Sequence, residues 1–320
     1  MSALRLGTRR SQLAMAQSRG VAEQVTRLTG RPVELVEITT YGDVSREALA
    51  QIGGTGVFVS ALRDALLADE IDFAVHSLKD LPTAQPDSLA LAAVPRRADP
   101  RDALVARDRL TFEKLAVARG RARVGTGSPR RMAQLNAWAR ALGCEIETVA
   151  IRGNVDTRIG YVRDGGLDAV VLASAGLHRL GREGEITDLL APDLVLPAPG
   201  QGALAVECVA SNADLTAALS ALDDPHTRVA VTAERALLAA LEAGCSAPVG
   251  AFADLSADGR DITEMRLRGA VGTPDGSTLV QLSTTGPVPG SADEAAAIGR
   301  ELAEEMLAKG AAGLMGERAH

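Results

Sequence analysis

Aromatic side chains are scarce in this chain. Phenylalanine, tyrosine and tryptophan together make up 2% of the 320 residues, although apolar residues of all kinds make up 46%. Alanine, leucine and valine must therefore fill most of the hydrophobic cores. Proteins that bind single-stranded nucleic acids stack the bases on exposed aromatic rings beside a basic surface. With so few rings and a net charge of −7, we expect no nucleic-acid partner.

Cysteines are few, and their spacing disfavours two common roles. The chain has Cys144, Cys208 and Cys245, and none of them belongs to a C-x-x-C motif. Three cysteines cannot all pair, so a disulfide framework and a cysteine-rich zinc site are both poor explanations. The four histidines show no metal-ligand spacing, and we therefore expect no metal.

Long apolar runs are missing as well. No run reaches the roughly 20 residues that a transmembrane helix needs. Residues 1–10 lack the apolar segment of a signal peptide. We expect a reduced, cytoplasmic and monomeric protein that has no membrane partner.

The first two-thirds of the chain alternates short β-rich runs with helical patterns. Residues 4–7 favour a strand, and residues 11–28 favour a helix that begins at a serine. A second alternating set begins at Ala103, where Ser128 and Pro129 are typical of a helix start. Such alternation predicts βαβ units and a mainly parallel sheet.

The pattern changes at residue 223. A helix over 226–243, ended by Gly244, precedes three β-like runs and a final helix over about 292–309. Residues 203–208 favour a strand that returns to the first lobe. We predict three domains, which are 1–96 with 200–220 (an α/β lobe), 102–196 (a second α/β lobe) and 223–320 (a smaller α+β domain). The chain is expected to cross between the two lobes twice, at about 96–102 and at about 194–199. Two lobes joined in this way predict a cleft, whose ligand sites lie beyond the carboxyl ends of the strands.

A polar loop follows the strand predicted over 71–75. It comprises residues 75–82 (VHSLKDLP). A polar run at a strand end, closed by proline, is typical of a loop that faces a cleft. A solvated surface loop is the alternative, because polar residues usually remain exposed.

Arginines occur at three strand-to-helix turns, namely 9–10, 125–131 (GTGSPRR) and 151–158 (IRGNVDTR). The helix dipole disfavours cations at a helix start, so these arginines need a negative partner. Guanidinium groups suit carboxylates and phosphates. One such turn could be an ordinary solvated helix start. Three turns on one predicted face indicate a cleft that binds several anionic groups.

Cys245 follows the predicted helix stop at Gly244, and its position in a loop makes it accessible. The alternative is a small buried filler, a common role for cysteine. A helix C-terminus does not lower the pKa of a thiol. A permanent covalent attachment therefore fits Cys245 better than the role of a fast nucleophile.

Together these motifs resemble those of the porphobilinogen deaminase family. The matching segments stand in the family's order within about residues 4–255, and they are 75–80, 125–131, 152–155, 175–181, 200–202 and 242–245. The resemblance implies two hinged α/β lobes like those of periplasmic binding proteins, plus a smaller C-terminal α+β domain.

The resemblance also implies a reaction. It is that of a hydroxymethylbilane synthase, a transferase of tetrapyrrole biosynthesis that serves haem and chlorophyll. Four molecules of porphobilinogen condense head to tail and release ammonia on a dipyrromethane cofactor, which a thioether joins to Cys245. Water then releases hydroxymethylbilane.

The resemblance further implies the site residues. Asp80 matches the catalytic aspartate, whose carboxylate would stabilise the cation that forms when porphobilinogen loses ammonia and would carry protons. Each pyrrole ring brings two carboxylates, so an acidic protein needs a local cationic lining. The residues expected to bind cofactor or substrate are Arg9, Ser11, Phe58, Ser77, Lys79, Thr126, Ser128, Arg130, Arg131, Arg152, Arg158, Arg179 and Gln201.

The sequence departs from the family at Thr55 and Ser60, where many members carry lysine. The departure removes two cations from a flap that the family places near its site. We expect activity to persist, because catalysis would rest on Asp80.

Three other classes of protein explain parts of this pattern. A solute-binding or effector-binding protein of the same two-lobed shape would carry no covalent adduct, and a secreted one would need a signal peptide. A transcription regulator would need a helix-turn-helix motif, whereas residues 1–40 favour β-α-β. A scaffold protein would not explain arginines at three turns.

Overall fold

The computed structural model describes residues 2–38, 56–242, 247–258 and 261–315, without the side chains of 56–58. The chain divides into two compact units. One unit is Met1–Ala98 with Gly202–Arg228, and the other is Asp99–Gln201 with Val229–His320. The three domains expected from the sequence stay a prediction, because the second unit combines an α/β sheet with most of the C-terminal part.

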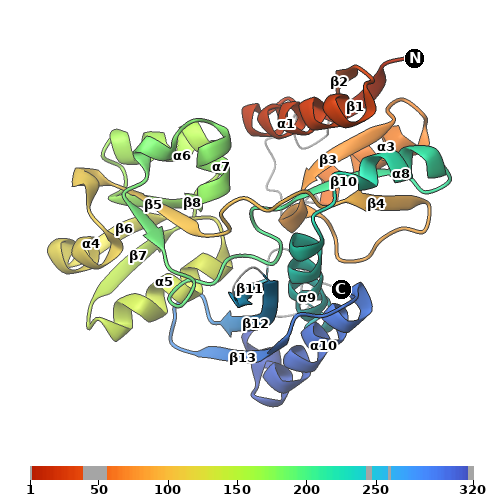
Figure 1. The fold of residues 1–320 in the computed structure, drawn as a ribbon. Helices are drawn as coiled ribbons and strands as arrows, with labels where there is room; N and C mark the ends of the chain where they lie inside the picture. The colour runs from red at the N-terminus through yellow and green to blue at the C-terminus, as the bar shows by residue number, and fades with distance from the viewer. Residues whose placement is uncertain (1, 39–55, 243–246, 259–260, 316–320) are drawn as a thin grey trace. The chain divides into compact units, whose positions relative to one another are not determined.

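The first unit contains a five-stranded sheet of order β2-β1-β3-β10-β4 (Figure 1). β1 is parallel to β2 and β3, whereas β10 is antiparallel to β3 and β4, so four strands share one direction. The mainly parallel sheet and the returning strand are thus confirmed. The elements are β1 (Leu4–Thr8), α1 (Gln12–Thr29), β2 (Val33–Glu37), α3 (Gly56–Leu67), β3 (Phe73–Ser77), η1 (Leu78–Asp80), β4 (Leu89–Ala93), β10 (Leu204–Val209) and α8 (Ala213–Ser220).

The second unit contains a sheet of the same design, with the order β7-β6-β8-β5-β9. β6 is parallel to β7 and β8, and β5 is antiparallel to β8 and β9. In each sheet, the antiparallel strand is the first one after the chain has passed from the other unit. This strand is β10 in the first sheet and β5 in the second. The elements are β5 (Asp102–Ala106), η2 (Arg107–Arg109), α4 (Phe112–Arg119), β6 (Arg121–Gly125), α5 (Pro129–Ala141), β7 (Glu145–Val149), α6 (Val155–Arg163), β8 (Ala169–Ala173), α7 (Ser174–Arg179), η3 (Glu183–Glu185) and β9 (Asp188–Leu190).

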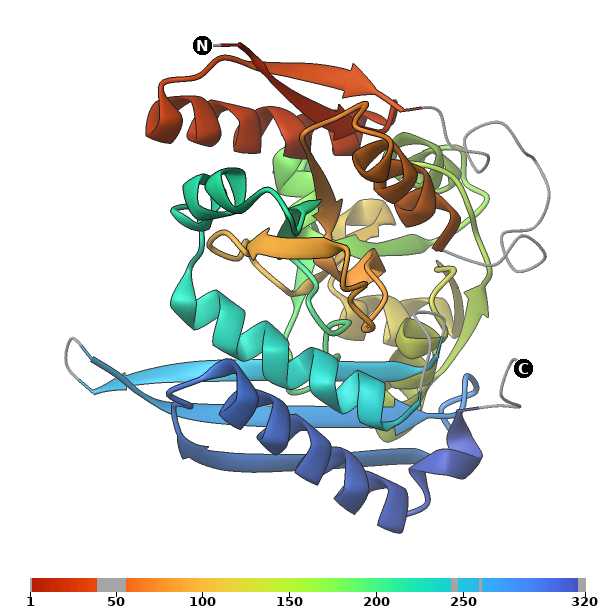
Figure 2. The same ribbon diagram turned by 90° about the vertical axis from the view of Figure 1, so that its right-hand side faces the viewer.

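The C-terminal part is an antiparallel three-stranded sheet with helices on one face (Figure 2). Its core includes Leu237, Leu267 and Met306, all fully buried. This part and the two α/β sheets confirm the predicted fold class. The elements are α9 (Pro225–Ala240), β11 (Val249–Asp258), β12 (Asp261–Gly272), β13 (Leu279–Pro287), α10 (Ala292–Ala308) and η4 (Ala311–Leu314).

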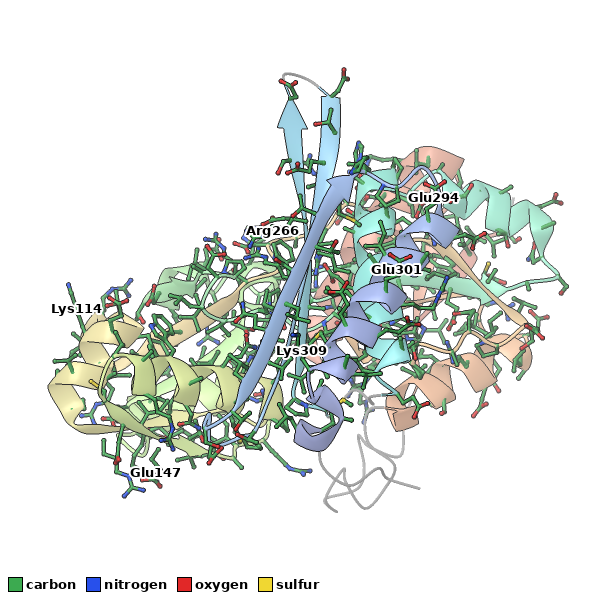
Figure 3. All side chains as sticks on the ribbon, turned by 90° about the horizontal axis from the view of Figure 1, so that it is seen from below. Lys114, Glu147, Arg266, Glu294, Glu301 and Lys309 are labelled. Atoms are coloured by element: carbon green, nitrogen blue, oxygen red, sulfur yellow. The ribbon has the colours of Figure 1, made fainter. Side chains whose placement is uncertain are left out.

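α10 illustrates how sequence periodicity positions a helix. Leu302 and Met306 are buried against the sheet, whereas Glu294, Glu301 and Lys309 are exposed on the other side (Figure 3). This separation is the amphipathic pattern expected of a surface helix. None of the helices in the described part of the chain is long and apolar enough to cross a membrane.

Side-chain caps fix two of the helix starts that matter for the site. Ser128 accepts a hydrogen bond from the Arg131 N–H, and Pro129 occupies the first turn of α5. Asn154 accepts from the Thr157 N–H at the start of α6. Such caps contribute about 1 kcal/mol each. The helix start predicted at Ser128 and Pro129 is confirmed.

The predicted end of α9 is wrong. The helix ends at Ala240 rather than at residue 243, and Glu242 adopts a left-handed backbone with φ of 52°. The Leu241 N–H still donates to the Leu237 carbonyl at 3.1 Å, and the left-handed backbone of Glu242 then ends the helical path. Gly244 lies outside the described residues.

Candidate active site

In the first unit, the polar loop after β3 forms the short 3₁₀ helix η1. Leu78 is fully buried, and its N–H donates to the carbonyl of Ala203 at 3.0 Å. Lys79 and Asp80 are half-buried beside it. Within the described part of the chain, no hydrogen bond or ion pair engages the Asp80 carboxylate. A buried leucine thus anchors the turn, and the carboxylate remains available to a ligand.

A second carboxylate supports this loop from β10. Glu207 is fully buried, and one of its oxygens accepts from Arg63 at 2.8 Å and from Gln85 at 3.0 Å. His76 Nε2 lies 3.2 Å from the other oxygen. Burial by itself raises the pKa of Glu207, but the pairing with His76 and Arg63 outweighs burial and lowers the pKa to about 2. This cluster ties α3 and the end of β3 to β10.

The remaining predicted residues of the first unit have varied surroundings. Ser11 caps α1 by accepting from the Ala14 N–H, and Ser77 accepts from Gln17 at 2.9 Å. Arg9 is half-buried at the end of β1. Phe58 belongs to α3, but its side chain lies outside the described residues.

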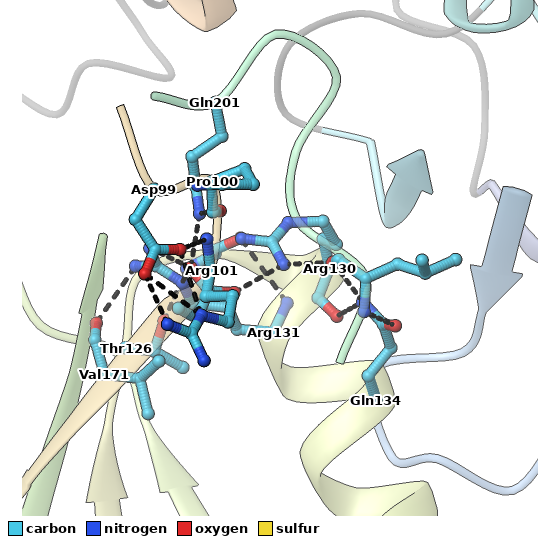
Figure 4. A network of polar contacts seen from close by, with 12 residues as sticks. Asp99, Pro100, Arg101, Thr126, Arg130, Arg131, Gln134, Val171 and Gln201 are labelled. Carbon is cyan, nitrogen blue, oxygen red and sulfur yellow. Dashed lines mark hydrogen bonds and ion pairs between the residues drawn. The ribbon is translucent and has the colours of Figure 1, made fainter. Parts of the chain in front are cut away.

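In the second unit, the predicted binding residues Arg130, Arg131 and Gln201, which are labelled in Figure 4, converge on one carboxylate that the sequence analysis missed. Asp102 is fully buried at the start of β5. Its Oδ2 accepts from Arg130 Nη1 at 2.7 Å. Its Oδ1 accepts from Arg131 Nη2 at 2.7 Å and from Gln201 Nε2 at 2.8 Å. Asp102 is thus the negative partner that the two arginines were expected to have.

Charge explains how Asp102 tolerates burial. Burial by itself raises the pKa of this carboxyl group, but the charges of Arg130 and Arg131 hold the pKa far below its ordinary value. Burial also lowers the pKa of Arg130, and the Asp102 charge opposes that shift. Because arginine stays protonated in proteins, two cations and one anion leave a net positive charge at this helix start.

The glycine turn before α5 packs against the next turn of the same sheet. A Cβ at Gly127 would lie 2.7 Å from the carbonyl oxygen of Ile151, so only glycine fits there. Thr126 is fully buried, and its hydroxyl accepts from the Ser128 N–H at 3.2 Å. Thr126 and Ser128 therefore shape the turn through their hydroxyl groups.

Other arginines lie around this turn. Arg158 is half-buried, and its Nε donates to the carbonyl of Gly153 at 2.8 Å. Burial and the charge of Arg131 lower the pKa of Arg158. Burial also lowers the pKa of Arg179, at the end of α7. Arg152 is exposed. Because the charge of Arg131 acts on Arg158, the two side chains belong to one positively charged region.

The three cysteines differ in their surroundings, and the described residues offer no metal site. Cys245 lies outside the described residues, as does Thr55, whereas Ser60 is exposed on α3. Cys208 is buried beside the Thr216 hydroxyl at 3.3 Å, and burial raises the pKa of its thiol. Within the described ranges, no group of three or more histidine, cysteine, aspartate or glutamate residues could hold a metal ion.

These observations define a protein with two α/β sheets, whose strand-to-helix turns carry arginines, and a C-terminal α+β part. Two family models match it: porphobilinogen deaminase, dipyromethane cofactor binding domain, over residues 4–217, and porphobilinogen deaminase, C-terminal domain, over 228–308. The chain belongs to the porphobilinogen deaminase family, the transferases of tetrapyrrole biosynthesis that are also called hydroxymethylbilane synthases. Its first matched domain is the one that binds the dipyrromethane cofactor.

Relatives of known name cover nearly the whole chain. Porphobilinogen deaminase 1 of Streptomyces avermitilis is 78% identical over 320 residues, which span 99% of each chain. Porphobilinogen deaminase of Thermobifida fusca is 58% identical over 96% of this chain and 94% of its own length.

Solved structures show more distant likenesses. A periplasmic binding protein from Salmonella typhimurium with high arginine specificity is 13% identical, with a TM-score of 0.37 over 69% of this chain and 92% of its own. The aliphatic sulphonate binding protein SsuA of Escherichia coli is 15% identical, with a TM-score of 0.38 over 76% of this chain and 71% of its own.

The residues of the second unit suit the cofactor. Each pyrrole ring of porphobilinogen carries an acetate and a propionate, and a dipyrromethane therefore brings four carboxylates. Arg130 Nε is buried, and no described residue accepts a hydrogen bond from it. A buried donor without a partner is rare unless a ligand or water satisfies it. A carboxylate ligand beside Arg130 would supply that acceptor.

Proposed function

We propose that this chain performs its family's reaction with Asp80 as the catalytic carboxylate. Four porphobilinogen molecules are joined head to tail, each loses ammonia, and water releases hydroxymethylbilane. The observation that carries the assignment is the half-buried carboxylate of Asp80, held on a turn that Leu78 anchors.

Asp80 acts on charge that develops during deamination. Departure of ammonia from porphobilinogen leaves a cation delocalised over the pyrrole ring. A fixed carboxylate stabilises this cation more than it stabilises neutral substrate, and this difference accelerates the step. The same carboxylate can accept a pyrrole N–H hydrogen bond and exchange protons with the reacting groups.

Arginines bind the acetate and propionate groups of the substrate and of the growing chain. The residues proposed for this role are Arg9, Arg130, Arg131, Arg152, Arg158 and Arg179, together with Lys79. Ser11, Phe58, Ser77, Thr126, Ser128 and Gln201 complete the proposed set, and several of them act by shaping the turns. Guanidinium groups bind carboxylates through paired hydrogen bonds.

Cys245 holds the cofactor through a thioether. The bound dipyrromethane supplies the first two rings, to which further rings are added. Cys208 is a poor candidate for this attachment, because its thiol is buried in the first unit beside Thr216. We further propose a cytoplasmic monomer that acts without a nucleic-acid or membrane partner.

Intact-mass measurement of the purified protein tests this function. The expected result is a mass above that of the polypeptide by two pyrrole units, together with hydroxymethylbilane formation from porphobilinogen. A solute-binding protein with the same fold would show the bare polypeptide mass and no turnover, and that result would overturn the proposal.

A further inference from the structure

The strand β5 contains one charged residue, and that residue is completely buried. Asp102 precedes Ala103, Leu104, Val105 and Ala106, which are all buried as well. Burial of a carboxylate among apolar side chains is costly unless hydrogen bonds and opposite charges compensate it. The compensation comes entirely from residues proposed to bind the pyrrole chain, and this coincidence calls for a functional explanation.

The partners reach Asp102 from two distant segments. Arg130 and Arg131 come from the first turn of α5, and Gln201 comes from the segment before β10. The Gln201 amide also donates to the carbonyl of Pro100 at 2.7 Å. The carboxylate therefore fixes where two adjacent guanidinium groups point, and Gln201 fixes the carboxylate (Figure 4).

The remaining contacts of the two arginines restrict them further. Arg130 Nη1 also donates to the carbonyl of Leu196 at 2.6 Å, and Arg131 Nη1 donates to the carbonyl of Val171 at 3.0 Å. The side chains of Arg130 and Arg131 are only 4% and 7% exposed. Arg130 Nε is buried without a hydrogen-bond partner among the described residues, whereas Nε, Nη1 and Nη2 of Arg131 each donate to the protein. These contacts therefore hold both guanidinium groups in one orientation.

We infer that Asp102 is a positioning residue, which orients Arg130 and Arg131 for the carboxylates of the pyrrole chain. The inference rests on the proposed function, because it takes these arginines to be ligand-binding groups. Asp102 also neutralises one of the two charges. One uncompensated positive charge then remains to attract a ligand carboxylate, while the repulsion between the arginines is reduced.

Asp223 is an arginine-paired carboxylate outside the proposed site. One of its oxygens accepts from Arg228 at 2.7 Å and the other from the Val94 N–H at 2.6 Å. That pair is satisfied without surplus charge. Asp223→Asn therefore serves as the matched control, since it removes an arginine-paired carboxylate that has no role in the proposed site.

The test compares Asp102→Glu, Asp102→Asn and Asp223→Asn in the full chain. For each we would measure the adduct fraction by intact mass, the KM for porphobilinogen, kcat and the thermal midpoint. Asp102→Glu keeps the charge but moves it by one methylene, and should raise KM about tenfold, the loss expected for one misplaced charge-assisted hydrogen bond. Asp102→Asn should raise KM further or lower the adduct fraction. Asp223→Asn should change only the thermal midpoint.

The outcomes separate this inference from the proposed function. If the wild-type protein carries no adduct and has no turnover, the proposed function fails whatever the variants do. If the wild type is active and Asp102→Glu keeps both its KM and its adduct fraction, Asp102 has no positioning role. Asp102→Glu decides the matter alone if Asp102→Asn does not fold.

Discussion

Arg131 Nη2 lies 2.7 Å from Asp102 Oδ1, and both side chains are almost completely buried. The sequence of this turn predicts a negative partner for Arg131. The structure shows that the protein itself supplies that partner and already holds the cation in place. Preorganised groups of this kind lose little freedom when a ligand binds, so their interaction free energy is available for recognition.

Arg158 should be needed for ligand binding, and Arg163 on the same helix should not. Arg158 is half-buried near the Arg131 charge, whereas Arg163 is exposed in the last turn of α6. Loss of a charge-assisted hydrogen bond costs roughly 1.5–3 kcal/mol. Arg158→Ala should therefore raise the KM for porphobilinogen by about tenfold or more, or impair cofactor assembly. Steady-state kinetics and intact mass check this, and equal effects of Arg158→Ala and Arg163→Ala would contradict it.

Arg182, another arginine of the second unit, is unsuitable as a control for Arg158→Ala. Its guanidinium forms ion pairs with Glu185 and Asp156, and its side chain is only 22% exposed. Replacing Arg182 would therefore disturb the start of α6 as well as the surface.

Glu207 should make the stability of the first unit depend on pH. Pairing with His76 and Arg63 lowers the folded pKa of Glu207 to about 2, below its ordinary value of 4.5, so ionised Glu207 stabilises the fold at neutral pH. This contribution is complete above about pH 4.5 and is lost as the pH falls toward 2. Glu207→Gln should therefore be less stable than wild type at pH 7, with a smaller difference at pH 3.

Urea unfolding at the two pH values measures this difference. Asp87→Asn provides a control, because Asp87 is exposed on the loop before β4. A stability difference for Glu207→Gln that does not change between pH 7 and pH 3 would show that the charge of Glu207 is unimportant.

Cys245 should be the only cysteine that carries the pyrrole adduct. Cys245→Ser should fold but should lack both the adduct and the activity, because the thioether requires sulfur. Cys144→Ser is the matched control, since Cys144 lies half-buried just before β7. Peptide mass mapping after digestion checks the assignment, and an adduct on a peptide containing Cys144 or Cys208 would refute it.

Local signals explain what the sequence could predict. The start of α5 at Ser128 and Pro129 depends on capping within one turn, and this local signal predicts it. A polar run at a strand end, closed by proline, predicts the loop over 75–82. The structure continues β3 to Ser77 and places η1 (Leu78–Asp80) directly after it. In each case the deciding residues lie within a few positions of one another.

Asp102 and Glu207 could not be found in this way. Each is a single acidic residue in an otherwise apolar strand, and that was the one available signal. Their partners are distant in the chain, since Arg130 follows Asp102 by 28 positions and Arg63 precedes Glu207 by 144. Asp102 meets its arginines only after β5 has paired with β8 in the second unit's sheet. Glu207 meets its partners only after β10 has paired with β3 in the first unit's sheet.

The negative charge of Asp80 should accelerate deamination. The most direct test is the single-turnover rate of Asp80→Asn against Asp80→Glu, on protein shown by mass to hold its cofactor. Asp80→Asn should be slower than wild type by roughly two to three orders of magnitude, the loss typical of one preorganised stabilising group. Asp80→Glu should retain more activity, because the charge remains and only its position shifts. Equal rates in the two variants, or a near-normal rate in Asp80→Asn, would contradict the account.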